Sequence, residues 1–271
     1  MFTTTLVSAF FRANDRLDRN VDKYIELGRV FLQSNSPKIV FLQASLLPDF
    51  TPYINQANTQ VIPIDNFEDL RWGSQFHRAT KTYSITDNPL KDSQRFFAMI
   101  CEKTEFVRRA IALNTFGTPN FAWVDFGIYH LFEPNLDMFM ADLHGIATAP
   151  VTKGLRIAHI WDCPDGELLD LYTLIRSVRW HFAGGVFGGH PDALIPFADR
   201  VAVQVEEILT IYSTFAWEVN VWYQVYCLTA KSPDDPHPWI KYHCDHNPSI
   251  LANYCTADPP HSTESPESVV S

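Results

Sequence analysis

Apolar residues along this chain occur both in short unbroken runs and in longer stretches with helical spacing. The short runs are rich in β-branched and aromatic residues and are bounded by turn residues, which is typical of buried strands. We expect such strands at residues 4–11, 38–42, 60–64, 121–124 and 155–161, and a glycine-rich extended segment at 182–189. The longer stretches repeat apolar residues every three or four positions, and they predict helices at residues 17–32, 93–111, 192–212 and 218–228.

Strands and helices therefore alternate, and this order predicts an α/β fold with buried parallel strands. No internal repeat or clean linker divides the chain, so we expect one domain over residues 1–256 with a helical C-terminal portion. Residues 257–271 are crowded with Pro and Ser and contain no basic residue. Such a segment cannot bury enough apolar surface to offset its ordering entropy, so we expect a disordered tail.

Composition and charge limit the functional classes. The chain has 271 residues, of which 46% are hydrophobic and 19% charged, with a formal net charge of −10. These values are ordinary for a globular protein. The acidic balance argues against a general nucleic-acid binder, which needs a basic surface to displace counterions. It leaves room for one anionic small molecule in a local basic cleft.

The cysteines and the N-terminus bear on the compartment. Five cysteines, an odd number with no C-x-x-C pair, suit buried thiols in a reducing cytoplasm better than a disulfide framework. The apolar N-terminal stretch has no basic residue ahead of it, so we do not expect a signal peptide. No apolar run approaches the roughly 18 residues that a membrane span needs. We therefore predict a cytoplasmic protein without a membrane span.

Two central motifs are candidates for chemistry. Asp125 follows directly on the strand predicted at 121–124, and open α/β sheets bind ligands outside the carboxyl ends of their strands. A carboxylate there either binds a metal or ribose, or merely caps a turn that Gly127 completes. Residues 183–189 hold four of the eleven glycines in the chain. Bare backbone of this kind either approaches a ligand closely, which we favour, or forms a β-bulge.

Two later motifs are also candidates. Glu218 opens a predicted helix, where a carboxylate is favoured by the helix dipole alone. The flanking Trp217 and Trp222 would give it an apolar environment and a raised pKa, as general acid/base catalysis requires. Residues 241–247 bring together Cys, Asp and two His, but their spacing matches no zinc finger. This cluster either donates one ligand to a shared metal site or is a surface group.

Several basic residues lie near these motifs in the sequence. A few cations around a strand-end carboxylate would suit a diphosphate beside a metal, although each is by itself more often a solvated surface charge. The residues are Arg12, Arg95, Lys103 and Arg179.

The combination of these motifs resembles the HtrL/YibB (WlaTC/HtrL) family of glycosyltransferase-like proteins. The resemblance extends to about residue 255, and its two central motifs, in this order and spacing, are fairly specific. The glycine-rich segment is also similar to the Gly-Gly-x-Phe-Gly-Gly stretch of blood-group-type galactosyltransferases. The motifs that carry the resemblance are residues 6–11, 103–106, 110–111, 114–116, 123–127, 183–189, 218–222 and 245–247.

The resemblance implies a GT-A-like, Rossmann-like mixed sheet flanked by helices, and transfer of a sugar from a UDP- or GDP-sugar to a hydroxyl of a glycan acceptor. Asp125 matches the first acid of the Asp-x-Asp pattern of GT-A enzymes, but Gly127 stands at the second. Because of this departure, Asp125 would bind Mn²⁺ or Mg²⁺ together with a second ligand from the C-terminal part of the chain. By analogy with related enzymes we choose His246 as that ligand. Glu218 is the implied catalytic residue, as a base in an inverting reaction or a stabiliser of the oxocarbenium-like centre in a retaining one.

The remaining donor-binding residues follow the same reasoning. The end of the first strand would hold the nucleoside, two cations would face the diphosphate, and two glycines would let the backbone approach the donor sugar, while aromatic residues near the cleft would stack on sugar faces. These residues are Ala9, Phe10, Phe11 and Arg12 for the nucleoside, Lys103 and Arg95 for the diphosphate, and Gly184 and Gly185 for the sugar, with Gly127 beside them.

Two other functional classes stay open. A non-catalytic nucleotide-sugar or carbohydrate-binding protein is suggested by the missing second acid. A metal-dependent hydrolase would use the same carboxylate and histidine.

Overall fold

A computed structural model describes residues 1–12, 21–86, 88, 91–162, 170–229 and 238–256. The predicted tail at 257–271 lies outside the described residues, as do the first four residues of the helix predicted at 17–32. No helix within these ranges is long and apolar enough to cross a membrane.

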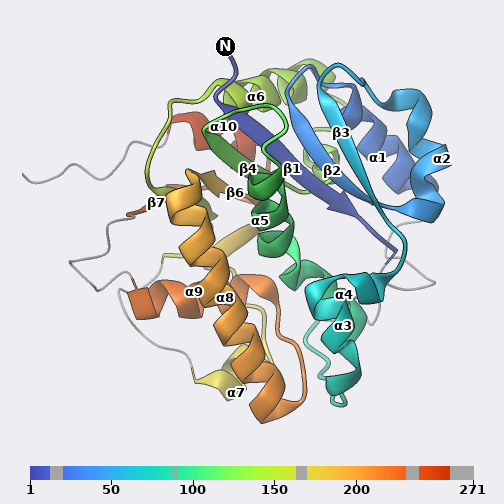
Figure 1. Ribbon diagram of the computed structural model, residues 1–271. Helices are drawn as coiled ribbons and strands as arrows, with labels where there is room; N and C mark the ends of the chain where they lie inside the picture. The colour runs from blue at the N-terminus through green and yellow to red at the C-terminus, as the bar shows by residue number, and fades with distance from the viewer. Residues whose placement is uncertain (13–20, 87, 89–90, 163–169, 230–237, 257–271) are drawn as a thin grey trace, which may run out of the picture.

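The described residues form a mixed sheet of seven strands in the order β3-β2-β1-β4-β6-β5-β7 (Figure 1). Neighbouring strands are parallel except that β6 runs antiparallel to both β4 and β5. The α/β fold and its mixed sheet are therefore confirmed. The strands are β1 (Thr4–Phe10), β2 (Lys38–Gln43), β3 (Thr59–Ile64), β4 (Asn120–Val124), β5 (Leu155–His159), β6 (Phe182–Gly189) and β7 (Trp239–His243).

Helices cover both faces of this sheet (Figure 1). On one face α5 contacts β1 and β4, and α8 and α9 pack beside it over β6. On the other face α6 and α10 contact β1, β5 and β7, together with α1. The helices are α1 (Val21–Gln33), α2 (Leu47–Phe50), α3 (Arg71–Gln75), α4 (Gln94–Cys101), α5 (Lys103–Leu113), α6 (Leu136–Thr148), α7 (Leu171–Leu174), α8 (Pro191–Tyr212), α9 (Glu218–Thr229) and α10 (Ser249–Thr256).

Each central strand contributes to two hydrophobic cores because successive side chains point to opposite faces of a sheet. In β1, Leu6 packs into the core under α1 and α6, while Val7 packs into the core under α5 and α9. In β4, Ala122 packs into the first of these cores and Trp123 into the second. Burial on both faces explains why these strands are unbroken apolar runs in the sequence.

The helix predicted at 93–111 is divided into α4 and α5 at Glu102. The Glu102 side chain is buried and accepts hydrogen bonds from the backbone N–H groups of Trp72 and Gly73 in α3. The apolar spacing continues through the break, so periodicity alone could not reveal it. Six helices and strands were not predicted, namely α2, α3, α6, α7, β7 and α10, and β5 ends at His159, two residues before the predicted end.

The second pair of glycines in β6 is required by packing. A Cβ on Gly188 would lie 2.4 Å from the Tyr254 hydroxyl oxygen and 2.6 Å from the carbonyl oxygen of Phe121. Gly189 has a φ of +151°, and its Cβ would lie 2.3 Å from the carbonyl oxygen of Gly154. The register between β5 and β6 also shifts between Ile157 and His159. Part of the glycine-rich motif therefore serves the sheet itself.

Candidate functional site

A cavity of about 390 Å³ opens at the carboxyl ends of β1 and β4, where α5, β6 and α9 meet. This volume lies in the range of small-molecule sites. Most of the residues that the sequence predicted line it, although they come from six separate parts of the chain. They are Ala9, Phe10, Phe11, Lys103, Asp125, Gly127, Gly184, Gly185, Glu218 and His246.

The two other predicted residues lie elsewhere. Arg12 and Arg95 are not among the residues that line the cavity within the described chain. The guanidinium of Arg95 lies over the ring of Phe67 at 4.3 Å and faces Glu68 at 3.8 Å. Its position in α4 turns it toward the 3-10 turn at residues 67–69, so the structure gives no support to a role at the diphosphate.

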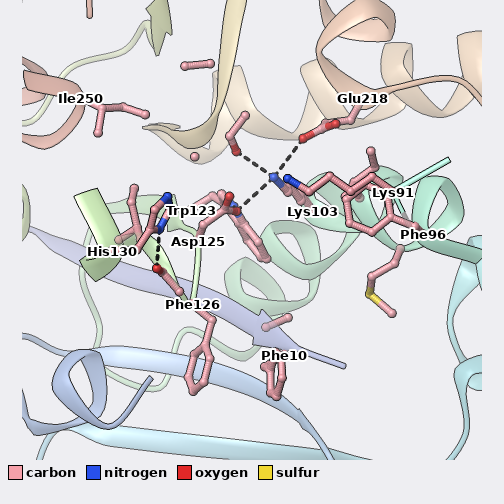
Figure 2. A pocket seen from close by; sticks show the side chains of 18 of the residues that line it. Phe10, Lys91, Phe96, Lys103, Trp123, Asp125, Phe126, His130, Glu218 and Ile250 are labelled. Carbon is pink, nitrogen blue, oxygen red and sulfur yellow. Dashed lines mark hydrogen bonds and ion pairs between the residues drawn. The ribbon is translucent and has the colours of Figure 1, made fainter. Parts of the chain in front are cut away.

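Lys103 is the centre of the charged group in the cavity (Figure 2). Its Nζ lies 2.9 Å from Glu218 Oε1, 3.0 Å from Asp125 Oδ1 and 2.9 Å from the carbonyl oxygen of Gly184. The side chains of Lys103 and Glu218 are only 9% and 4% exposed, whereas that of Asp125 is 39% exposed. One ammonium thus bridges two carboxylates, and the two carboxylates differ in their access to solvent.

Local structure explains why these three groups meet. Lys103 and Glu218 are the first residues of α5 and α9, and Asp125 directly follows β4. The Asp125 backbone N–H donates to the carbonyl of Gly185 at 2.9 Å, which continues the pairing of β4 with β6. The indole N–H of Trp123 donates to Asp125 Oδ1 at 2.7 Å and fixes the carboxylate further. The site is therefore built on the ends of regular elements.

Burial sets the protonation behaviour of the group. It raises the pKa of Glu218, an effect that the neighbouring Lys103 opposes. Burial would lower the pKa of Lys103, but the charges of Asp125 and Glu218 outweigh it, so this pKa is raised and the ammonium stays charged. Glu218 Oε2 is buried without a hydrogen-bond partner within the described residues. A buried carboxylate oxygen of this kind is ready to accept a proton or hydrogen bond from a ligand.

Gly184 lacks a side chain where the charged group needs space. A Cβ at Gly184 would lie 2.3 Å from Glu218 Oε1 and 3.2 Å from Lys103 Nζ. At Gly185 a Cβ would approach Ile250 Cδ1 at 3.0 Å and Ile128 Cδ1 at 3.2 Å. The bare backbone at Gly184 therefore admits the protein's own carboxylate, a requirement that sequence reasoning had attributed to a donor sugar.

An aromatic stack forms one side of the cavity. The ring of Phe10 stacks on Phe126 with centroids 5.5 Å apart and on Tyr24 with centroids 4.8 Å apart. In Figure 2, Phe10 and Phe126 lie below Asp125, whereas Glu218 lies above Lys103. The sequence singled out Phe10 from its place at a strand end, but Tyr24 lies on α1 and has the spacing of an ordinary core residue.

Further aromatic side chains line the cavity near Glu218. Trp217, the residue before Glu218, packs edge-on against Phe96 of α4 and against Trp180, with centroids 5.8 and 5.9 Å apart. The ring of His246 packs edge-on against Trp180 at 4.8 Å. Trp222, which the sequence placed beside Glu218, instead packs in the core against Phe187 at 4.9 Å. Trp180 carries no local signal that sequence reasoning could have used.

The side chains of Asp125 and His246 could bind a divalent cation only if a bound substrate supplied further ligands to its coordination shell. Asp125 and His246 both line the cavity, but no group of three or more His, Cys, Asp or Glu in the described ranges is arranged to hold a metal. Burial lowers the pKa of His246, which favours the neutral imidazole that binds metals. Mg²⁺ commonly takes one or two protein ligands together with substrate phosphates and water. The residues therefore fit a cation brought with a phosphorylated substrate.

The other residues of the 241–247 cluster face away from this site. His243 Nε2 lies 2.9 Å from Asp245 Oδ1, and its ring packs edge-on against His159 on the neighbouring strand at 5.3 Å. Cys244 is buried, and burial raises the pKa of its thiol to about 11. Within the described residues, His246 is the member of the cluster that reaches the cavity.

Comparison with known proteins gives one relationship. No family model matches the chain. The chain is similar to protein HtrL of Escherichia coli (strain K12), with 28% identity over 197 residues. The match covers 65% of this chain and 62% of protein HtrL. This similarity agrees with the family suggested by the sequence motifs, and protein HtrL is a distant relative of the chain.

Proposed function

We propose that the protein is a glycosyltransferase that moves a sugar from a UDP- or GDP-sugar to a hydroxyl of a glycan acceptor. The observation that carries this proposal is the Lys103-bridged pair of Asp125 and Glu218 in a cavity at the carboxyl ends of the strands. Ligands of open α/β sheets bind at this edge. Two carboxylates with different exposure are suited to two different tasks, as in other sugar chemistry.

The nucleoside would bind against the aromatic side of the cavity. Phe10, Phe126 and Tyr24 offer stacked rings next to the end of β1, and Ala9 and Phe11 complete this wall. A base stacked on aromatic rings gains about 1–3 kcal/mol in nucleic-acid complexes. The diphosphate would then extend toward Asp125 and Lys103, because Phe126 directly follows Asp125 in the chain.

Charge balance supports a divalent cation at the diphosphate. Lys103, Asp125 and Glu218 together carry +1 and −2, a net charge of −1 when all three are ionised. A diphosphate placed beside them would meet repulsion unless a further cation accompanied it. Asp125 and His246 would hold Mn²⁺ or Mg²⁺ there. The bound ion would neutralise the charge that develops on the leaving diphosphate.

Glu218 would act at the reacting carbon. In the transfer, a bond forms between the acceptor oxygen and the anomeric carbon of the donor sugar. The bond from that carbon to the diphosphate oxygen breaks, and the electron pair leaves with the nucleoside diphosphate. In an inverting reaction the Glu218 carboxylate would accept the acceptor's proton. In a retaining one its charge would stabilise the oxocarbenium-like centre, and the acceptor's proton would leave on the departing diphosphate. Lys103 binds Oε1, and Oε2 has no hydrogen-bond partner within the described residues.

The proposal is tested first by donor binding. We expect thermal unfolding to shift upward with at least one member of a UDP- and GDP-sugar panel, and more so in the presence of Mn²⁺. If no donor stabilises the protein under either condition, the glycosyltransferase proposal fails. Stabilisation without release of nucleoside diphosphate to any glycan acceptor would instead identify a non-catalytic nucleotide-sugar-binding protein.

The metal ligands are tested separately. His246→Ala should weaken the Mn²⁺-dependent part of donor binding and leave the metal-free part unchanged. His243→Ala is the matched control, because His243 is exposed at the end of β7 and does not line the cavity within the described residues. Equal Mn²⁺ dependence in the wild type and His246→Ala would refute the assignment of His246.

A further inference from the structure

The cavity has an internal order that can be followed from one contact to the next. The Phe10 ring stacks on Phe126, which follows Asp125. Asp125 pairs with Lys103, and Lys103 pairs with Glu218. Trp217 precedes Glu218, and its ring packs against Trp180. An aromatic stack therefore lies at one end of this series, a charged group lies in the middle, and a pair of tryptophans lies at the other end.

The tryptophan end differs from the Phe10 end in its access to ligand. Trp217 is 7% exposed and is wedged between Phe96, Phe97 and Trp180. Trp180 is half-buried and presents part of its ring to the cavity. A partly exposed indole in the same cavity as the Glu218 carboxylate combines an apolar face with a hydrogen-bond acceptor. This combination suits the apolar C–H face and the hydroxyl edge of a pyranose ring.

The position of Trp180 is fixed by buried hydrogen bonds. Asn220 is fully buried in the first turn of α9, two residues after Glu218. Its side-chain amide donates to the carbonyl oxygens of Leu174 and Ser177, and its Oδ1 accepts from the backbone N–H of Arg179 at 2.8 Å. One helix turn thus holds both Glu218 and the segment that leads into Trp180. This shared anchor keeps the indole at a constant place relative to the carboxylate.

We propose that Trp180, supported by Trp217, is the platform on which a pyranose ring of the acceptor glycan stacks. This inference rests on the proposed glycosyltransferase function, and it specifies where in the cavity the acceptor binds. The donor nucleoside has its own aromatic stack at Phe10 and Phe126, next to Asp125. Trp180 packs against His246 at 4.8 Å, so it lies beside the proposed cation ligand and not against this stack. The acceptor has to approach the reacting carbon from beside Glu218. Trp180 and Phe96 are partly exposed aromatic residues that line the cavity and pack against Trp217, and of the two Trp180 has the larger ring face for a sugar.

Glycoside binding tests the platform without requiring turnover. Saturation-transfer NMR with methyl α- and β-glycopyranosides avoids aryl groups, which would themselves stack on tryptophan. The measurement is made with and without UDP or GDP and Mn²⁺, in case the donor site must be filled first. For the wild type we expect saturation of the ring C–H protons of at least one pyranoside.

Three variants give the platform a matched comparison. Trp180→Ala should weaken pyranoside binding about tenfold or more, and Trp180→Phe should retain part of it. Trp161→Ala is the control, because Trp161 is 43% exposed and does not line the cavity within the described chain. Each variant's thermal unfolding is measured in parallel, and Trp180→Phe keeps the test valid if Trp180→Ala does not fold.

The outcomes separate this inference from the proposed function. Binding of no pyranoside by the wild type, or equal binding by the wild type, Trp180→Ala and Trp180→Phe, would overturn the platform. Weaker binding of UDP or GDP by Trp180→Ala, with unchanged pyranoside binding, would assign the ring to the nucleoside and also overturn it. If pyranosides bind through Trp180 but no nucleotide sugar binds, the platform stands and the glycosyltransferase proposal fails.

Discussion

Two buried lysines, Lys103 and Lys38, differ in their neighbouring charges, and their pKa values are shifted in opposite directions. Lys103 lies in the cavity between two carboxylates, and their charges raise its pKa despite its burial. Lys38, at the start of β2, is fully buried, and its neighbours in the described residues are neutral oxygens of Ser34, Asn58 and Thr59 at 2.7 to 3.4 Å. Burial lowers the pKa of Lys38 to about 7.

Their tasks follow from these surroundings. Lys38 donates to the carbonyl oxygen of Ser34, just past the end of α1, and so ties the helix to the sheet. It is not among the residues that line the cavity around Lys103. Lys103 instead orients two carboxylates toward an open space. Burial of a charge is therefore not by itself a sign of function, and what distinguishes Lys103 is the combination of opposite charges and a cavity.

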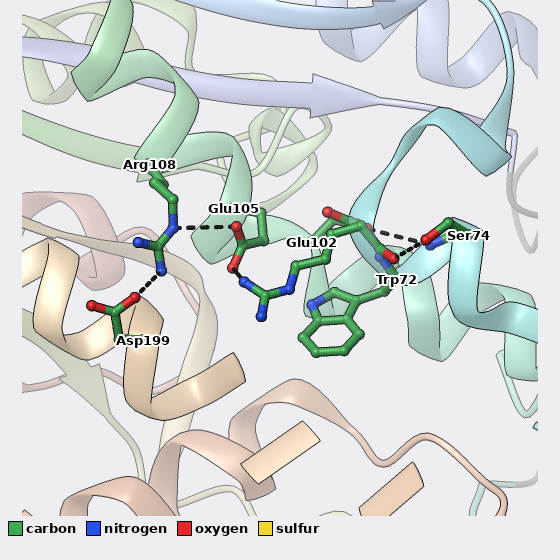
Figure 3. Close-up of polar contacts among 8 residues, drawn as sticks. Trp72, Ser74, Glu102, Glu105, Arg108 and Asp199 are labelled. Carbon is green, nitrogen blue, oxygen red and sulfur yellow. Dashed lines mark hydrogen bonds and ion pairs between the residues drawn. The ribbon is translucent and has the colours of Figure 1, made fainter. Parts of the chain in front are cut away.

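The buried carboxylates Glu218 and Glu102 repeat this contrast. Burial raises the pKa of Glu102 to about 8, and its side chain accepts hydrogen bonds from backbone N–H groups at the start of α3 (Figure 3). Beside it, Glu105 pairs with Arg71, which joins α5 to α3, and with Arg108 of α5 itself. Arg108 also pairs with Asp199 of α8. The Glu102 carboxylate is used within the fold, whereas Glu218 lines the cavity and its buried Oε2 has no hydrogen-bond partner in the described residues.

The largest effect should come from Glu218→Gln. We expect turnover to fall by about 10²–10⁴-fold, because the amide can neither accept a proton nor carry the stabilising charge. Donor binding should be kept or strengthened, because one negative charge is removed near the diphosphate. Initial rates of nucleoside diphosphate release and donor titrations measure the two quantities. Glu102→Gln is the control, and a comparable loss of turnover in that variant would remove the distinction between the two glutamates.

The next effect concerns stability. Lys103→Met should lower the free energy of unfolding by about 3–5 kcal/mol, because it leaves a buried carboxylate without its cation. Lys38→Met should cost much less, since no charged partner is left behind and an apolar side chain replaces a desolvated amine. Urea unfolding of both variants at pH 7 makes the comparison. Equal losses would show that the carboxylate pair does not depend on Lys103.

Glycine substitutions probe the geometry of the charged group. Gly184→Ala should displace the Glu218 carboxylate, because the new Cβ would lie 2.3 Å from Oε1. A shift of this kind can reduce turnover by about 10²-fold. Gly127→Ala should have a much smaller effect, since its φ is −96° and a Cβ there meets Tyr24 Cε1 at an ordinary 3.4 Å. Steady-state turnover rates of the two variants test this difference. A larger loss of turnover in Gly127→Ala than in Gly184→Ala would contradict this account of the glycine-rich strand.

The last prediction concerns a pH dependence of stability that comes from Lys38. Its pKa is lowered from the ordinary 10.5 to about 7 in the folded protein. Between these values the unfolded chain binds the proton and the folded protein does not, so stability rises with pH by at most about 1.4 kcal/mol per unit. Below pH 7 both states are protonated and this contribution is constant.

Subtraction isolates the contribution of Lys38, because other buried groups also titrate. Glu102, for example, has its pKa raised, so its contribution falls as the pH rises from 4.5 to about 8. The free energy of unfolding of the wild type minus that of Lys38→Met, measured from pH 7.5 to 10, should increase with pH. A flat difference would mean that Lys38 keeps its ordinary pKa in the fold.

Sequence reasoning located those parts of the fold whose signals are local. The strands β1, β2 and β4 are rich in apolar residues because both faces are buried, so their positions could be predicted closely. The break between α4 and α5 at Glu102 could not be predicted, because the hydrogen bonds that the Glu102 side chain accepts there come from the distant backbone of α3. The short strand β7 has an alternating burial pattern at the sheet edge and lacked the signal of a buried run.

The site was predictable to the extent that it is built on the ends of elements. Asp125, Gly184 and Glu218 stand at a strand end, in a glycine cluster and at a helix start, and each could be singled out locally. Tyr24 and Trp180 reach the cavity only through tertiary packing. The partnership of Lys103 with both carboxylates is likewise invisible in the sequence, since its three members are 22 to 115 residues apart.

The central claim is that Glu218 is the reacting carboxylate of a nucleotide-sugar transferase. Its most direct test follows nucleoside diphosphate release from the UDP- and GDP-sugar panel by the wild type and Glu218→Gln, with binding of the same donors measured alongside. We predict that at least one donor binds to both proteins and that only the wild type turns it over at an appreciable rate. Binding of no donor by the wild type, or equal turnover by the two proteins, would contradict the claim.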